Sequence, residues 1–211
     1  MSTTPQTTKG TRTRARILQA ATDIFAEMGY HDASIVKITE AAGIAQGTFY
    51  LYFSSKQEVF EQVVLDLNSR VRHAMVEASS AQTDRISAER AGFRAFFQFT
   101  ARNPQLYRVI RQAEFVAPHV LRRHYERIAE GYVEGLRAAQ ARGELAPVDP
   151  EVLAWALMGI GEIVGMRWAL WEDDVPPSER PDGVPPMVFE ATMRLIERAL
   201  APEPPATGRE G

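Results

Sequence analysis

The chain has 211 residues, a formal net charge of −3 and 45% hydrophobic residues, a composition typical of a globular protein with a buried core. It contains no cysteine, which excludes disulfide bonds, thiolate metal sites and a cysteine nucleophile. The first 16 residues, MSTTPQTTKGTRTRAR, lack the apolar core of a signal peptide, so we expect the protein to lie in the cytoplasm.

Positive charge is concentrated at the N-terminal end of the sequence. Residues 1–56 carry six basic and four acidic side chains, including every lysine of the chain, whereas the remainder is net negative. Lys9, Arg12, Arg14 and Arg16 precede the first acidic residue. A basic arm of this kind favours a nucleic-acid partner through electrostatic attraction, although basic tails also occur in proteins that bind nothing.

The first predicted helix covers residues 11–28. Its apolar side chains recur at helical spacing and form one stripe: Ile17, Ala20, Ile24, Phe25 and Met28. Gly29 is expected to end this helix, because glycine adopts backbone conformations that other residues avoid. Residues 29–32 then lead to the next helix, so the first three helices are predicted to form one bundle.

A short second helix is predicted to follow Ser34. The hydroxyl of Ser34 can accept a hydrogen bond from a free backbone N–H at a helix start. The apolar residues that follow share one helical face: Ile35, Ile38 and Ala42. Gly43 suits the left-handed conformation that commonly ends a helix, so the chain is expected to turn there.

Another short helix is predicted for residues 45–53. Phe49 and Phe53 lie four residues apart and are expected to be core. The opposite face carries groups that can hydrogen-bond bases or phosphates, and a lysine follows: Gln46, Thr48, Tyr50, Tyr52 and Lys56. Two helices joined by a tight turn suit DNA reading, because the major groove admits one helix. For Tyr50 and Tyr52, a packed ring with its hydroxyl in water is the alternative.

The run TEAAGIAQGTFYLYFSSK resembles the N-terminal domain of the TetR family of bacterial transcriptional regulators. It is similar to that family's pattern A-x-x-A-G followed by G-x-x-Y-x-[YH]-F-x-[SN]-K. The resemblance implies that the matching positions approach DNA, mostly through its phosphates: Ser34, Gln46, Gly47, Tyr50, Tyr52 and Lys56. Leu51 departs from the family, in which a polar or aromatic residue is common at this position.

The rest of the chain is also predicted to be helical. Ser55 and Glu58 form a capping box before a long helix of residues 56–79. Apolar stripes and proline positions predict further helices over residues 86–103, 105–116, 118–142, 152–171 and 187–201. No segment shows sustained alternation of apolar and polar residues, so the fold class is all-α with about nine helices. We expect a DNA-binding arm and domain in residues 1–56, an effector-binding and dimerisation domain in 57–201, and a disordered tail in 202–211.

Residues 152–171 form the most apolar run of the chain. A run of this length suits a membrane helix, but Glu162, Arg167 and three glycines favour a helix buried inside a protein. One chain has too few helices to cover it on two faces. We therefore predict a homodimer held by residues 152–171 and 187–201, as the family resemblance also implies, with Gly161 and Gly165 admitting a close helix. Such a dimer would read a palindromic operator.

The resemblance further implies a pocket for a small effector in the middle of the chain. The residues expected to line it are mostly aromatic: Phe93, Phe96, Phe97, Tyr107, Arg111, Phe115, Tyr125, Trp155, Met158 and Met166. Taken singly, each is also explained as core. The sequence QAEF at residues 112–115 resembles family members that sense fatty acyl-CoA, and nearby arginines can bind an anionic head group, so an acyl-CoA is one candidate effector.

A transcriptional regulator is favoured over two alternatives. The expected function is a repressor that a small hydrophobic effector releases from its operator. An enzyme would need a catalytic motif, and the only carboxylate cluster, residues 172–174, is predicted to lie in a loop. The histidines lack metal-ligand spacing, so no metal or cofactor is expected. A helical scaffold that binds protein is the remaining alternative, and it predicts no binding to duplex DNA.

Overall fold

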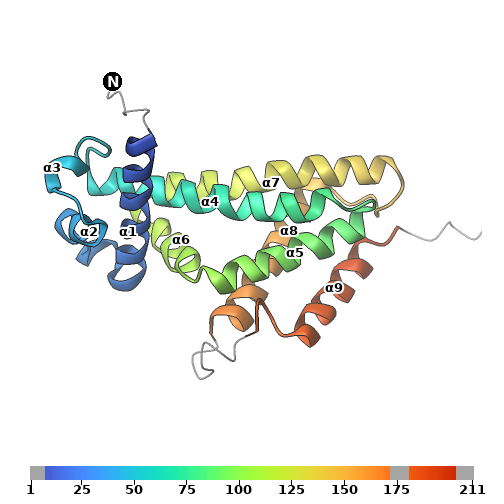
Figure 1. Ribbon diagram of the computed structural model, residues 1–211. Coiled ribbons are helices and arrows are strands. Elements are labelled where there is room, and N and C mark those ends of the chain that lie inside the picture. The colour runs from blue at the N-terminus through green and yellow to red at the C-terminus, as the bar shows by residue number, and fades with distance from the viewer. Residues whose placement is uncertain (1–7, 172–180, 203–211) are drawn as a thin grey trace, which may run out of the picture. The chain divides into compact units, whose positions relative to one another are not determined.

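The computed structural model describes residues 8–171 and 181–202, in which every regular element is a helix (Figure 1). The elements are α1 (Thr8–Asp32), α2 (Ile35–Ala42), α3 (Gln46–Phe49), α4 (Lys56–Ser80), α5 (Arg85–Arg102), α6 (Gln105–Val116), α7 (Pro118–Ala141), α8 (Pro150–Gly165), the π-helical turn η1 (Met166–Leu170) and α9 (Pro186–Leu200). The predicted all-α fold is thus confirmed. The carboxylate cluster at 172–174 and the predicted tail beyond residue 202 lie outside the described residues.

Helix ends follow local sequence signals. Gly29 has φ 79° and ψ 163°, which breaks the helical conformation of α1 at the predicted place. The hydroxyl of Ser55 accepts from the backbone N–H of Glu58 at 3.0 Å, as the capping box predicts. The Glu58 carboxylate accepts from the backbone N–H of Ser54 at 2.6 Å, one residue earlier than in the standard box.

The start of α8 was placed two residues too late by the apolar pattern. Asp149 is the N-cap, and its carboxylate accepts from the N–H groups of Glu151 at 2.8 Å and Val152 at 3.1 Å. Pro150 occupies the first turn, where its missing N–H costs nothing. Asp149 and Pro150 break the apolar pattern of the sequence, although the helix begins at these residues.

The chain divides into two compact units, whose boundaries fall inside α4 and α7. Unit 1 comprises the chain up to Arg70 together with Asn103–Tyr125, and unit 2 comprises Val71–Arg102 and the chain from Glu126 onward. These boundaries separate two groups of residues that contact each other, whereas the predicted boundary after residue 56 separates the DNA-binding domain from the effector-binding and dimerisation domain. The functional division therefore stays a prediction.

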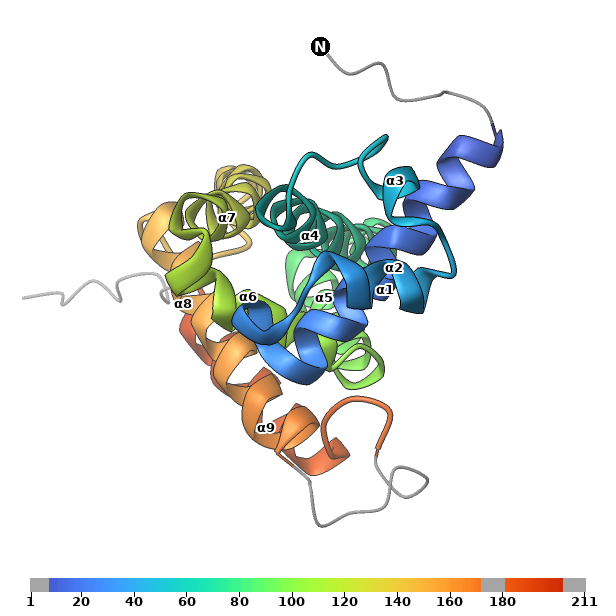
Figure 2. The ribbon, with the colours of Figure 1, turned by 90° about the vertical axis from the view of Figure 1, so that its left-hand side faces the viewer.

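Unit 1 is built around α1, which packs against α2 and α6. Figure 2 shows α2 and α3 beside α1. Its fully buried side chains include Ile17, Phe25, Ile38, Phe49 and Phe60. The rings of Phe25 and Phe60 meet edge to face at 5.1 Å, so α4 is also anchored in this core.

Unit 2 has a separate core made by side chains of α5, α7, α8 and α9, among them Phe97, Leu136, Leu157 and Met193. Gly161 and Gly165 of α8 are buried against α5. A Cβ atom would lie 3.4 Å from the Phe93 ring at Gly161, and 3.4 Å from the Phe96 ring at Gly165. The expectation that these glycines admit a close helix is confirmed, but the helix is α5 of the same chain, so their expected part in the dimer interface is wrong.

The remaining face of α8 is exposed and apolar. Val152 is 63% exposed, Trp155 43% and Ile163 57%, and on α9 Met187 is 79% and Leu195 60% exposed. By length and composition alone the helical stretch Pro150–Leu170, with mean hydropathy 1.3, could cross a membrane. Its opposite face, however, packs in the core of unit 2, as expected for a core helix of a globular protein.

Candidate functional site

The turn between α2 and α3 is fixed by local hydrogen bonds. Ser34 accepts from the backbone N–H of Lys37 at 3.2 Å and thereby caps α2. Gly43 ends α2 in the left-handed conformation, with φ 61° and ψ 44°. The guanidinium of Arg16 donates to the carbonyl oxygens of Ala42 and Gly43, which ties α1 to this turn. A side chain at Gly43 would meet this guanidinium, because a Cβ would lie 3.1 Å from its Nη2.

α3 is shorter than the predicted helix of residues 45–53. It spans Gln46–Phe49, and the chain then continues in tighter turns, with the N–H of Tyr52 donating to the carbonyl oxygen of Phe49 at 2.9 Å. The N–H of Phe53 donates to the same oxygen at 3.0 Å. Phe49 and Phe53 are 0% and 2% exposed, which confirms that they are core. Their burial holds the tight turn in place despite the loss of regular α-helical bonding.

Residues 46–48 and 50–52, which flank Phe49 and precede Phe53, form a largely exposed surface. Gln46 and Gly47 are exposed, Tyr50 is 50% exposed and Thr48 and Tyr52 are half-buried. Leu51, the departure from the family pattern, is 61% exposed. The structure thus brings five of the predicted DNA-contacting residues onto one turn and its continuation, whereas the hydroxyl of Ser34 is engaged as a cap.

The side chain of Lys56 does not face outward, contrary to the sequence-based expectation. Its ammonium donates to the carbonyl oxygens of Tyr30 at 2.7 Å, Ala33 at 2.8 Å and His31 at 3.3 Å. The ammonium also lies 4.4 Å from the centroid of the Tyr30 ring. Lys56 therefore binds the link between α1 and α2, which has free carbonyl oxygens because Gly29 interrupts the helix.

Two further residues of unit 1 were missed by the sequence analysis. The side-chain amide of Gln112 on α6 donates to the carbonyl oxygen of Phe25 at 2.9 Å and accepts from the N–H of Tyr30 at 2.8 Å. Arg16 was counted only as positive charge of the arm. No local sequence signal indicates these hydrogen bonds, because Arg16 and Gln112 each bind backbone groups that lie at least 26 residues away in the chain.

The predicted effector residues are divided between the two units. Tyr107, Arg111, Phe115 and Tyr125 belong to unit 1, and the others belong to unit 2. Phe93 and Phe97 are 3% and 1% exposed and lie against each other with ring centroids 5.9 Å apart, so they are core. Phe115, in contrast, is 84% exposed.

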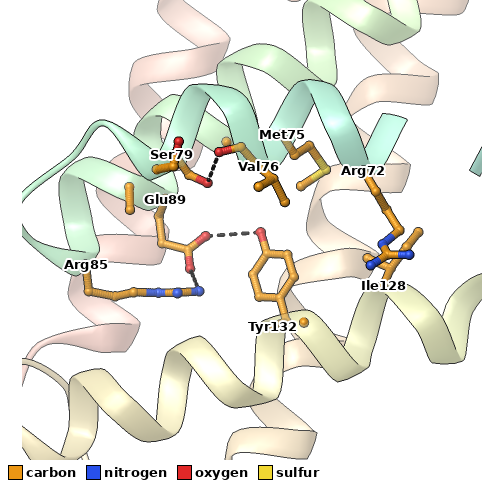
Figure 3. A pocket seen from close by; sticks show the side chains of 12 residues that line it. Arg72, Met75, Val76, Ser79, Arg85, Glu89, Ile128 and Tyr132 are labelled. Atoms are coloured by element: carbon orange, nitrogen blue, oxygen red, sulfur yellow. Dashed lines mark hydrogen bonds and ion pairs between the residues drawn. The ribbon is translucent and has the colours of Figure 1, made fainter. Parts of the chain in front are cut away.

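A cavity of about 270 Å³ lies within unit 2 between α4, α5 and α7 (Figure 3). Its lining comprises Arg72, Met75, Val76, Ser79, Ser80, Arg85, Ala88, Glu89, Gly92, Ile128, Gly131 and Tyr132. None of the predicted effector residues is among them. The cavity combines an apolar wall, which includes Met75, Val76 and Ile128, with a polar group of three side chains.

The polar group consists of Arg85, Glu89 and Tyr132. The Arg85 guanidinium donates to one carboxylate oxygen of Glu89, and the Tyr132 hydroxyl donates to the other at 3.1 Å. Glu89 is 2% exposed. Burial raises the pKa of the Glu89 carboxyl, although Arg85 and the Tyr132 hydrogen bond act in the opposite direction. Burial also raises the pKa of Tyr132 well above its usual range, so its hydroxyl keeps its proton.

The α2–turn–α3 module, with its short second helix presenting polar groups, defines a helix-turn-helix DNA-binding protein. Residues 17–63 match the family model for bacterial regulatory proteins of the tetR family. The chain is 31% identical over 159 residues to the uncharacterized HTH-type transcriptional regulator YdgC of Bacillus subtilis (strain 168), a match that covers 73% of this chain and 80% of YdgC.

Two further similarities are narrower in what they show. The fatty acid metabolism regulator protein of Bacillus subtilis is 46% identical over 44 residues, which cover 21% of this chain and 23% of that protein. The structure of Salmonella enterica GusR superposes with a TM-score of 0.73 at 24% identity, over 90% of this chain and 95% of GusR, and shows a shared fold.

The chain belongs to the TetR family of bacterial transcriptional regulators. It is accordingly a DNA-binding transcriptional regulator of a family that forms dimers and responds to small molecules.

Proposed function

We propose that this protein is a homodimeric repressor that a small effector, bound in unit 2, releases from a palindromic operator. The observation that carries the proposal is the exposed surface of α3, where Gln46, Gly47 and Tyr50 stand free of the core while Phe49 and Phe53 anchor it. A regulator with this role acts in the cytoplasm, where its DNA lies.

The residues of the exposed turn at α3 are proposed to contact different parts of the DNA. Gln46, Gly47 and Thr48 stand at the N-terminal end of α3, where base edges and phosphates are met first. Tyr50 and Tyr52 follow, and their hydroxyls suit phosphate oxygens. A phosphate contact by Lys56 would require this ammonium to exchange one of its carbonyl partners. We therefore assign Lys56 chiefly to positioning α2 and α3, and secondarily to the charge that DNA meets.

The proposed dimer uses the exposed faces of α8 and α9. Val152, Trp155, Gly159 and Ile163 lie three or four residues apart and share one side of α8. On α9, exposed Met187 and Leu195 lie eight residues apart, two helical turns along one face. Exposed apolar residues that share one helix face favour an interaction site. A second copy of the chain would cover it with the same surface, as twofold symmetry requires.

The class of effector has two candidates. A fatty acyl-CoA is supported by the sequence resemblance and by the name of one relative, a fatty acid metabolism regulator, but that match covers 21% of this chain. A smaller ligand is supported by the cavity of about 270 Å³ in unit 2. A series of acyl-CoAs of increasing length, added to the protein–operator complex, distinguishes them: release that strengthens with chain length supports the acyl-CoA, and no release at any length excludes it.

The DNA-binding part of the proposal is tested by selecting bound fragments from random duplex DNA at low salt. We expect the selected fragments to contain a palindrome, with half-sites about one helical turn apart or at multiples of that spacing. Enrichment of no sequence, together with no salt-dependent binding to any duplex, would support the helical scaffold instead.

A further inference from the structure

We infer that the cavity of unit 2 takes a compact, uncharged molecule whose hydroxyl or carbonyl oxygen binds at Arg85, Glu89 and Tyr132 and whose ring or short chain fills the apolar part. This inference rests on the proposed function only for its regulatory consequence, namely that the molecule is the effector. Size, hydrogen-bonding capacity and charge balance of the cavity each contribute to it.

The size of the cavity limits the ligand. An apolar cavity of about 150 Å³ holds one benzene ring. The volume of about 270 Å³ therefore suits a body of about two rings or a short branched chain. It is below the range of roughly 300–1,000 Å³ that is usual for drug-sized ligands. Because Val76 of the lining is 60% exposed, the cavity opens to solvent, and this volume measures the part of a ligand that the site surrounds.

The polar group has unused hydrogen-bonding capacity. The Nε of Arg85 is buried and has no hydrogen-bond partner among the described residues. The Glu89 carboxylate accepts from Arg85 and Tyr132, which occupies about half of its roughly four acceptor sites. Because the Nε is enclosed by protein atoms, a ligand oxygen can accept from it only after the Arg85 side chain shifts, whereas a ligand hydroxyl can donate to Glu89, which lines the cavity. A buried donor without a partner is costly, so an oxygen at this place stabilises the bound state.

The charge balance excludes an ionised ligand head. Arg85 and Glu89 are an ion pair with side-chain exposures of 17% and 2%, so their charges cancel inside the wall. A carboxylate or an ammonium on the ligand would add a buried charge without a counter-charge, which is strongly unfavourable. Arg72, the other charged residue of the lining, is exposed and therefore hydrated. An uncharged oxygen satisfies the polar group without this penalty.

Gly92 provides a way to close the cavity by mutation. It lies on α5 in the lining, and a Cβ atom built on it would meet no heavy atom within 4 Å. A leucine at this position can therefore extend into the empty space without displacing the backbone. The matched control is Ala138→Leu, which adds the same side chain on the exposed surface of α7.

The test uses three naphthalene probes of similar size at pH 7: neutral 2-naphthol, anionic 2-naphthoate and cationic 2-naphthylmethylammonium. Calorimetry on the full-length protein should show 2-naphthol binding at least tenfold more tightly than either ion. Gly92→Leu should weaken 2-naphthol binding at least tenfold, and Ala138→Leu should leave it unchanged. Glu89→Gln leaves Arg85 without its counter-charge, so 2-naphthoate should then bind more tightly than 2-naphthol.

Several results would overturn the inference: no binding of 2-naphthol, preference of the unmutated protein for an ion, equal binding by Gly92→Leu with an unchanged melting temperature, or no change of preference in Glu89→Gln. Operator affinity is measured in parallel. Binding of 2-naphthol without any change in operator affinity would leave the ligand class standing and refute the proposed effector release. Operator binding without 2-naphthol binding would refute only the ligand class.

Discussion

The ammonium of Lys56 lies 2.8 Å from the carbonyl oxygen of Ala33, the residue directly before the N-cap of α2. Lys56 is the first residue of α4, so a single side chain joins the start of this long helix to the link that positions the helix-turn-helix. The family motif ends at this lysine, and its charge stabilises the link between α1 and α2.

Lys56→Ala should destabilise the protein. The substitution leaves the carbonyl oxygens of Tyr30 and Ala33 without a charged donor, so we expect the free energy of unfolding to fall by about 1–3 kcal/mol. Urea denaturation measures this loss. The control is Lys37→Ala, because Lys37 is exposed and its ammonium makes two long contacts, with the carbonyl oxygen of Asp32 at 3.3 Å and the sulfur of Met28 at 3.4 Å. Equal stability of both variants would show that the Lys56 contacts contribute nothing.

Tyr50→Phe should weaken operator binding without affecting stability. The Tyr50 side chain is 50% exposed, and its hydroxyl is proposed to donate to a phosphate. Loss of one such hydrogen bond, worth about 1 kcal/mol, should raise the dissociation constant about fivefold on every operator sequence. Fluorescence anisotropy with labelled duplex measures it, and a melting temperature equal to that of the unmutated protein is the control. An unchanged dissociation constant would remove Tyr50 from the contact surface.

Charged substitutions on α8 should have opposite consequences on its two faces. Ile163→Asp and Leu195→Asp place a carboxylate on the exposed apolar surface, so we expect folded monomers with weakened operator binding. Gly161→Asp instead drives a side chain into Phe93 and Phe96, so we expect unit 2 to lose stability.

Light scattering combined with thermal melting separates these outcomes. Val148→Asp serves as control, since Val148 is 41% exposed and lies outside α8 and α9. A dimer that survives both Ile163→Asp and Leu195→Asp would place the interface elsewhere.

Stability should fall between pH 6.5 and pH 4 because of His124. Burial lowers the pKa of His124 to about 4, and its Nδ1 lies 2.8 Å from the Nδ2 of the buried Asn68 amide. The unfolded chain therefore binds more protons than the folded chain in this window, so the free energy of unfolding decreases as the pH falls. A pKa of about 4 in place of the ordinary 6.5 corresponds to about 3 kcal/mol of stability.

Urea denaturation at several pH values, compared with His124→Gln, measures this contribution. The variant should lose less stability than the unmutated protein over the same range. Parallel curves for the two proteins would show that His124 titrates normally in the folded state.

Local signals were sufficient to predict that the helices and the turn exist, although not all of the helix ends. Ser34 and Gly43 act through neighbouring backbone groups, so their roles follow from sequence. The direction of the Lys56 side chain was misjudged because its ammonium binds the carbonyl oxygen of Tyr30, which is distant in the chain. The neighbours of Gly161 were misjudged because they are phenylalanines of α5, also distant in the chain. The end of α3 was misjudged because the burial of Phe53, and not helix propensity, decides how the chain leaves this turn.

The polar group in the cavity could not be found from sequence for a related reason. Arg85 and Glu89 lie four residues apart on α5, a spacing that is typical of a solvated surface pair. Their partners lie far away in the chain, since Tyr132, which hydrogen-bonds Glu89, comes 43 residues later. The apolar neighbours Ala88 and Gly92 were the available sequence signal for burial, because they place Arg85 and Glu89 beside the apolar face of α5, which must pack against another helix.

The shortness of α3 limits how much sequence information one chain can extract from DNA. Four helical residues rise about 6 Å, less than two base-pair steps of about 3.4 Å each. Even a reading of about four base pairs distinguishes only a few hundred sequences, whereas a genome offers about a million or more competing sites. In the proposed dimer, a second copy would double the number of base pairs and thereby square the number of distinguishable sequences. The rest of the selectivity would then come from half-site spacing and from the stiffness of the DNA between the half-sites.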